Sequence, residues 1–162
     1  MVPKNTQQSK AQSKTIVIGI GNEYRSDDGA GIIAANRLRE RISNDTMILV
    51  KDGEPNELMD CWMHADKVIL IDAMSSNESP GTLTRFNVGE KPLPSKLFHY
   101  STHSFNIAEV IELARVLNKL PKELIVFGVE GRDFGNGDRI SPEVDRAIEK
   151  IVECIKEELE LN

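Results

Sequence analysis

The sequence predicts an α/β fold, a three-layer α/β/α sandwich around a mostly parallel five-stranded sheet. Short runs rich in β-branched residues alternate along the chain with amphipathic helical stretches, which is typical of βαβ units. One run, residues 67–72, is almost entirely apolar, as expected of a strand covered on both faces. No repeat or low-complexity linker interrupts the pattern, so we expect a single domain over residues 15–162.

The first helix follows a buried strand at residues 15–20 and a glycine-bearing turn. Ser26 is placed to cap a helix that runs to about Ile42, and Asp27 and Asp28 suit its positively polarised N-terminus. The inner face of this helix is expected to carry Ile32, Ala35, Leu38, Arg39 and Ile42.

Two more strands extend the parallel part of the sheet. Residues 46–50 predict a second strand that ends just before Asp52, and a helix is expected near residues 55–64. The apolar run at 67–72 predicts the third strand, which ends at Asp72.

An edge strand and a long loop come next. The Pro-Gly turn at residues 80–81 leaves no room for a crossover helix, so residues 82–88 predict an edge strand that is antiparallel to its neighbour. Residues 89–102 contain two prolines and exceed the usual length of a connection, which marks this loop as a candidate functional segment.

The last third predicts a helix, a strand and a helix. Ser104 can cap a helix that reaches about Leu117, and residues 124–129 predict the last strand. After a glycine-rich stretch, Ser141 and Pro142 supply the N-cap and first residue of a final helix. Its apolar face consists of Val144, Ile148, Ile151, Ile155 and Leu159.

Composition excludes several kinds of partner. The chain has 20 Lys and Arg against 26 Asp and Glu, a formal charge of -6 without a basic cluster, so nucleic acid and membrane are not expected partners. Its apolar runs are far shorter than the ~20 residues that cross a bilayer. Residues 1–14 are polar and predict a disordered tail, not a signal peptide. Two distant cysteines, Cys61 and Cys154, suit a reducing compartment, and we expect a cytoplasmic monomer.

Candidate site residues gather at the carboxyl ends of the predicted strands, where open α/β sheets form their sites. They are Asp28, Asp52, Asp72, His103 and Glu130. Acidic groups on one rim repel one another, so such a rim more naturally binds a cation. Two carboxylates and one imidazole favour a borderline divalent ion such as Ni, Zn, Fe or Mn.

Structural explanations of the same residues stay open at this point. Asp27 and Asp28 could be charges at a helix N-terminus, Asp72 could cap a turn, and His103 could be a loop histidine bonded to backbone. A zincin site is rejected, because His99 and His103 are four apart but lack the Glu of His-Glu-x-x-His. The glycine turn lacks the third glycine of a dinucleotide fingerprint, since Tyr24 stands there.

A combination of short motifs resembles the [NiFe]-hydrogenase maturation endopeptidases over residues 15–159. The motifs are Gly19-Ile20-Gly21-Asn22, Asp27-Asp28-Gly29-x-Gly31, Ile71-Asp72-Ala73, Pro80-Gly81-Thr82 and Ser101-Thr102-His103. The resemblance implies that Asp28, Asp72 and His103 bind metal and form the catalytic site. Asp27, Asp52 and Glu130 are expected to support them. The Ser-Thr-His-Ser-Phe stretch at residues 101–105, together with Gly128-Val129-Glu130-Gly131, looks closest to the branch that serves bidirectional, NAD(P)-linked hydrogenases.

The resemblance further implies an endopeptidase, filed with the aspartic-type enzymes, that removes the C-terminal extension of a hydrogenase large-subunit precursor after nickel insertion. The precursor is then the partner and presents the nickel, although other divalent metals could occupy the site. Two alternatives remain open: a non-catalytic, nickel-dependent maturation chaperone, and a flavodoxin-like nucleotide-binding domain suggested by the glycine turn after the first strand.

Overall fold

The computed structural model describes residues 14–98 and 105–161, which form one α/β unit. Its strands are β1 (Thr15–Ile20), β2 (Met47–Lys51), β3 (Lys67–Met74), β4 (Leu83–Asn87) and β5 (Glu123–Glu130). Its α-helices are α1 (Ala30–Arg41), α2 (Pro55–Trp62), α3 (Ile107–Val116) and α4 (Pro142–Glu160). Two one-turn 3-10 helices, η1 (Ser26–Gly29) and η2 (Ser95–Phe98), lie in the connections.

The strands form one sheet in the order β2-β1-β3-β5-β4. Strands β2, β1, β3 and β5 are mutually parallel, whereas the edge strand β4 runs antiparallel to β5. This confirms the predicted fold class, including the antiparallel edge strand. The central position of β3 explains its apolar sequence, because every residue from Val68 to Met74 is buried.

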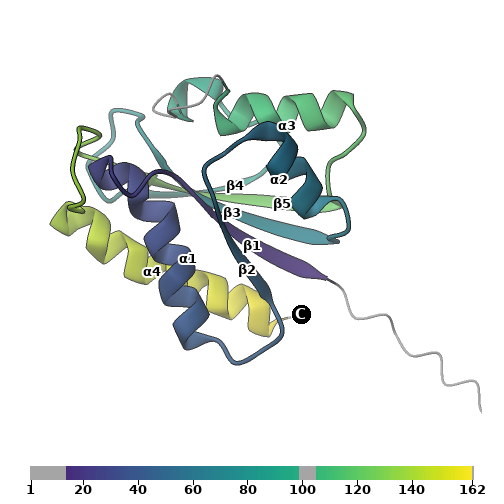
Figure 1. Ribbon diagram of the computed structural model, residues 1–162, viewed down its shortest axis with the longest axis horizontal. Coiled ribbons are helices and arrows are strands. Elements are labelled where there is room, and N and C mark those ends of the chain that lie inside the picture. Colours follow the sequence, from purple (N-terminus) through teal and green to yellow (C-terminus); the bar gives the residue numbers. More distant parts are fainter. Residues whose placement is uncertain (1–13, 99–104, 162) are drawn as a thin grey trace, which may run out of the picture.

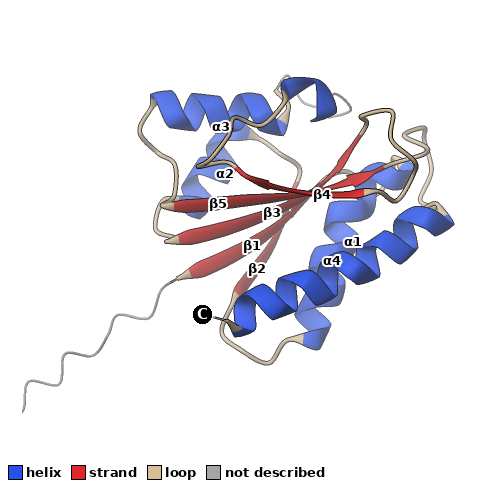
Figure 2. Cartoon of the chain, turned by 180° about the vertical axis from the view of Figure 1, so that it is seen from behind, coloured by secondary structure: helices blue, strands red, loops and turns tan. Residues whose placement is uncertain are grey.

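Helices cover both faces of the sheet, which gives three layers (Figures 1 and 2). Helices α1 and α4 pack on one face, and α2 and α3 pack on the other. Alternation along β1 divides its side chains between the two cores, with Ile16 and Ile18 facing α2 and α3, and Val17 facing α1 and α4. Each core thus has its own layer, and the carboxyl edge of the sheet is left to the loops.

The start of the first helix differs from the prediction. Residues 26–29 form the 3-10 turn η1, and α1 begins only at Ala30. Ser26 does not cap it, because the Ser26 hydroxyl donates to the carbonyl of Gly135 at 3.0 Å instead. Arg39, expected on the inner face, is exposed, and the buried residues are Ala30, Gly31, Ala34, Ala35 and Leu38. Ala35 and Leu38 are thus buried as predicted, and the small residues Ala30, Gly31 and Ala34 join them because α1 lies very close to the sheet.

Other boundaries shift by a few residues. Helix α3 begins at Ile107, with Asn106 as N-cap in a reciprocal capping box with Glu109, so the expected cap at Ser104 is wrong. The predicted long loop contains the turn η2, whose Phe98 is buried. Ser141 and Pro142 stand at the predicted N-cap and N1 positions of α4.

The predicted tail lies outside the described residues apart from its last member. Lys14 is anchored, since its backbone N–H donates to the Asp66 carboxylate at 3.0 Å and its carbonyl accepts from Asp66 and Lys67. The expectation of disorder was therefore wrong for Lys14, and it stays a prediction for residues 1–13. Among the described helices, none has the length and apolar character that crossing a membrane requires.

Candidate functional site

A cleft opens at the carboxyl edge of the sheet, where β1, β2 and β3 end. Two aspartates of the predicted site, Asp28 and Asp72, line this cleft together, and Asp52 lies at its rim. The other lining residues are Ile20, Gly21, Gly53, Ala73, Phe98, Phe105 and Ile107. The cleft therefore combines acidic groups with an apolar wall.

Asp72 lies near the end of the central strand β3, opposite Gly128 of β5. Asp72 is only 9% exposed. Burial raises the pKa of the Asp72 carboxyl well above its ordinary value, and the neighbouring charge of Asp28 raises it further, while a hydrogen bond from the backbone of Ala73 acts in the opposite direction. A cation placed beside Asp72 would therefore favour its charged form.

Asp28 reaches the same cleft from the turn η1. Its backbone N–H donates to the carbonyl of Arg25 at 3.1 Å, and its carbonyl accepts from Asn22 at 3.2 Å. That carbonyl packs directly against Gly21, where a Cβ atom would come within 1.9 Å of it. Asp28 is 6% exposed. Gly21 therefore lets the turn fold back onto the end of β1.

A second close approach brings helix α1 down onto the strand ends. At Gly31, a Cβ atom would lie 2.2 Å from the carbonyl oxygen of Ile71 and 2.4 Å from that of Ile20. Only glycine permits this contact, which places the start of α1 and the preceding turn beside Asp72. Gly21 and Gly31 are thus both explained by close packing of the chain against itself.

Asp27 lies next to Asp28 in sequence but does not line the cleft. Its carboxylate is fully buried and accepts hydrogen bonds from the backbone N–H groups of Arg132, Asp133 and Ser141 and from the Ser141 hydroxyl, at 2.7–2.9 Å. These donors belong to the loop between β5 and α4, which lies beside η1 in Figure 1. Asp27 thus fastens two loops together.

Glu130 and Asp52, the other expected supporting residues, have different surroundings. Glu130 is buried at the end of β5, and its carboxylate accepts from the backbone N–H and the hydroxyl of Ser76. It holds the segment after β3 and does not line the cleft. Asp52 is exposed, and its Oδ1 accepts from the backbone N–H of Glu54 at 3.1 Å.

His103 lies outside the described residues, so its proposed role stays a prediction. Within residues 14–98 and 105–161, no three His, Cys, Asp or Glu side chains are grouped as a metal site. Asp28 and Asp72 nevertheless fit part of such a site. Both are buried, both line the cleft, and the charge of Asp28 acts on Asp72, so they form a donor pair suited to a divalent cation.

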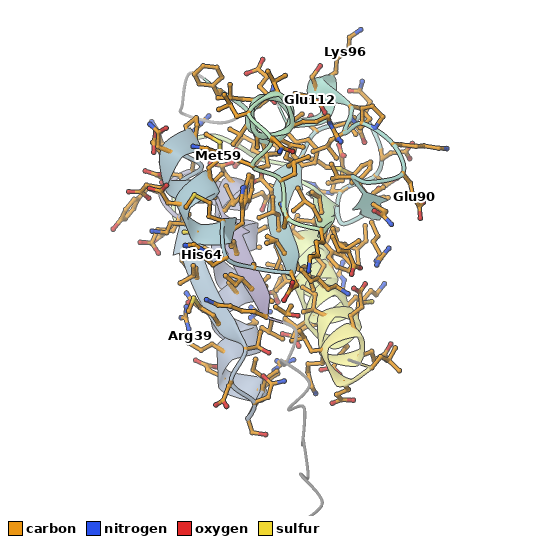
Figure 3. All side chains as sticks on the ribbon, turned by 90° about the vertical axis from the view of Figure 1, so that its right-hand side faces the viewer. Arg39, Met59, His64, Glu90, Lys96 and Glu112 are labelled. Atoms are coloured by element: carbon orange, nitrogen blue, oxygen red, sulfur yellow. The ribbon has the colours of Figure 1, made fainter. Side chains whose placement is uncertain are left out.

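The apolar wall of the cleft was not predicted. Phe98 of η2 is buried, whereas Phe105, just before α3, remains 44% exposed. Figure 3 shows Lys96 of the same η2 turn projecting away from the body of the molecule. The only available signal was the position of these aromatic residues at the two sides of the Ser-Thr-His-Ser stretch.

The cysteines do not form a second site. Burial raises the pKa of the Cys61 thiol, which disfavours the reactive thiolate. Cys154 is an exposed free cysteine on α4.

Comparison with known proteins identifies similar chains. A model of the hydrogenase maturation protease family, HycI, matches residues 32–158. The hydrogenase expression/formation protein HupD of Thiocapsa roseopersicina is 29% identical over 155 residues, which cover 89% of this chain and 70% of HupD. The hydrogenase 2 maturation protease of Escherichia coli is 26% identical over 147 residues, 88% of each protein. The solved structure of the hydrogenase maturating endopeptidase HybD from E. coli matches with a TM-score of 0.72 at 26% identity, over 88% of this chain and 89% of HybD.

Proposed function

Because the chain belongs to the hydrogenase maturation protease family, we propose that it removes the C-terminal extension of a [NiFe]-hydrogenase large-subunit precursor after nickel insertion. The substrate is then a protein that carries its own nickel. The observation that carries this proposal is the pair of buried carboxylates, Asp28 and Asp72, in one cleft.

Asp28 and Asp72, together with His103, are proposed to bind the nickel that the precursor presents. Both carboxylates are buried, and the pKa of Asp72 is raised by that burial and by the neighbouring charge of Asp28, so a bound cation would favour the charged form of Asp72. Bound nickel would supply positive charge that anchors the precursor and can polarise a nearby carbonyl. Three protein ligands would leave coordination positions for groups from the precursor.

The chain's own residues would then position the precursor around this point. Phe98, Phe105 and Ile107 form an apolar wall beside the carboxylates and would exclude water from one side of a bound peptide. Asp28 and Asp72 would be presented by the turn η1 and by strand β3, regular elements of the fold.

We place this step in the cytoplasm and expect the protease to act as a monomer. The cysteines support the first statement, since Cys61 and Cys154 are both free. The net charge of -6 supports a protein partner over nucleic acid or an anionic membrane.

The test compares precursor purified with nickel and precursor purified without it. After incubation with the protease, mass spectrometry of the precursor should show loss of the C-terminal peptide only in the nickel-containing sample. Equal cleavage of both samples would show that the protease does not need nickel to recognise the precursor. Nickel-dependent binding with no change of mass would instead indicate a chaperone.

A further inference from the structure

Two consecutive aspartates in one turn have opposite surroundings. Asp28 lines the cleft, whereas Asp27 is fully buried outside it. Both belong to the 3-10 turn η1, in which neighbouring side chains point in directions about 120° apart. Fixing the direction of the Asp27 side chain therefore also fixes the direction of its neighbour.

The Asp27 carboxylate is held at both ends of one loop. Arg132 and Asp133, at the start of the loop, donate backbone N–H groups to Oδ2 at 2.8 and 2.9 Å. Ser141, at its end, donates its backbone N–H to Oδ1 at 2.7 Å and its hydroxyl to Oδ2 at 2.8 Å. A carboxylate can accept all four bonds, but an amide in the same place has only one acceptor oxygen.

The residue before Asp27 is held in an unusual conformation. Ser26 has φ 53°, in the left-handed region that costs a non-glycine residue free energy. It is tied to the same loop, since its backbone N–H donates to Gly137 at 2.8 Å and its hydroxyl donates to Gly135 at 3.0 Å. Such a conformation persists only where surrounding contacts impose it. The loop 131–141 therefore sets the shape of the turn.

We propose that Asp27 is a positioning residue: by binding the loop 131–141 it holds Ser26 in its left-handed conformation and so directs the Asp28 carboxylate toward Asp72. Asp27 does not touch the substrate and acts only through Asp28. This inference rests on the proposed function, because it concerns how Asp28 binds nickel and precursor.

The chain offers a matched pair of serines for the test. Ser141→Ala removes the hydroxyl bond to the buried Asp27 and keeps the N–H bond from the same residue. Ser76→Ala does the same at the buried Glu130, where the lost hydroxyl bond is 2.7 Å long and the N–H bonds remain. Both variants lose one hydroxyl–carboxylate bond, but only the first bond belongs to the turn of Asp28.

Three measurements are made on each variant: the urea midpoint, Ni²⁺ affinity of the isolated protein by calorimetric titration, and kcat/KM on nickel-containing precursor. Both variants should lower the urea midpoint to a similar extent. Ser141→Ala should also weaken Ni²⁺ binding and kcat/KM by about 10-fold, as loss of an outer-sphere partner does, whereas Ser76→Ala should change neither. Ser141→Thr, which keeps the hydroxyl, should restore both.

The controls separate two kinds of failure. Asp28→Asn should abolish Ni²⁺ binding and processing, and if it has no effect on either, the proposed function itself is wrong. If Asp28→Asn acts as expected but Ser141→Ala matches Ser76→Ala in affinity and in kcat/KM, the positioning role of Asp27 is overturned.

Discussion

Asp27 and Asp72 are both buried carboxylates at the same edge of the sheet, yet their surroundings differ. Asp27 accepts four hydrogen bonds at 2.7–2.9 Å and has no part in the cleft lining. Asp72 lines the cleft beside a second carboxylate, Asp28, and its pKa is raised by burial and by that neighbour. Burial alone therefore does not identify a functional acid; a buried acid next to a like charge is the better candidate.

The largest effect on precursor processing is expected from substitution of the two carboxylates that line the cleft. Asp72→Asn and Asp28→Asn keep the size of each side chain but remove a proposed nickel ligand, and each should reduce precursor processing by ~100-fold or more. The measurement is the rate of C-terminal peptide loss by mass spectrometry. Unchanged far-UV circular dichroism would show that the fold is intact. If a variant cleaves at the wild-type rate, the substituted residue is not part of the functional site.

Asp27→Ala tests the structural side of the comparison. It leaves three backbone N–H groups and one hydroxyl without their acceptor in a buried position. The free energy of unfolding should fall by about 3 kcal/mol in urea denaturation. Asp138→Ala, at an exposed position of the same loop, is the control and should change it by less than ~0.5 kcal/mol. Similar values for the two variants would contradict the assigned role of Asp27.

Asp72→Asn should stabilise the metal-free protein, in contrast to Asp27→Ala. Because the pKa of Asp72 is raised in the folded state, the folded protein binds a proton more tightly than the unfolded chain. Wild-type stability is therefore lost as pH rises from the ordinary pKa of Asp toward the raised value, and the Asn variant avoids this loss. At pH 7 in a chelator, the Asn variant should therefore have the higher free energy of unfolding.

The pH dependence supplies the check on this prediction. Melting curves of both proteins should diverge as pH rises above ~4 and converge below it, where Asp72 is protonated in both states. A difference that grows toward low pH would show that the sign is wrong.

The smallest effect is expected at Asp52, which shares the cleft but is exposed. Its hydrogen bond from the Glu54 N–H goes to an oxygen that Asn also has. Asp52→Asn should change stability by less than ~0.5 kcal/mol and should reduce processing by less than ~10-fold, since it lies outside the proposed ligand set. If Asp52→Asn reduced processing as much as Asp72→Asn does, Asp52 would be a nickel ligand, and exposure would not distinguish ligands from other acids of the cleft.

The position of the acids could be predicted because it depends on strand order. Asp28 follows β1 and Asp72 lies near the end of β3, and adjacent parallel strands bring their carboxyl ends to one edge. Hydrophobic periodicity is a local property, so it located the strands and helices to within a few residues.

The direction of each side chain could not be predicted, because it depends on distant contacts. Ser26 looked like a helix cap, yet its hydroxyl binds Gly135, and only the loop contacts separate Asp27 from Asp28. The apolar wall arises in the same way, since Phe98 and Phe105 meet the cleft through the packing of η2 and α3. No spacing in the sequence encodes these contacts.

The hydrogen bonds of Asp27 also determine when, during synthesis, the turn that holds Asp27 and Asp28 can be fixed. Its donors lie 105, 106 and 114 positions further along the chain. A ribosome-bound chain that ends before Ser141 contains Asp28 and Asp72, but it lacks the Ser141 bonds that close the loop around the turn. Because chains emerge from the N-terminus onward, the turn is locked only after Ser141 has been made, 114 positions after Asp27. A nascent chain therefore holds both acids before the turn that directs one of them is fixed.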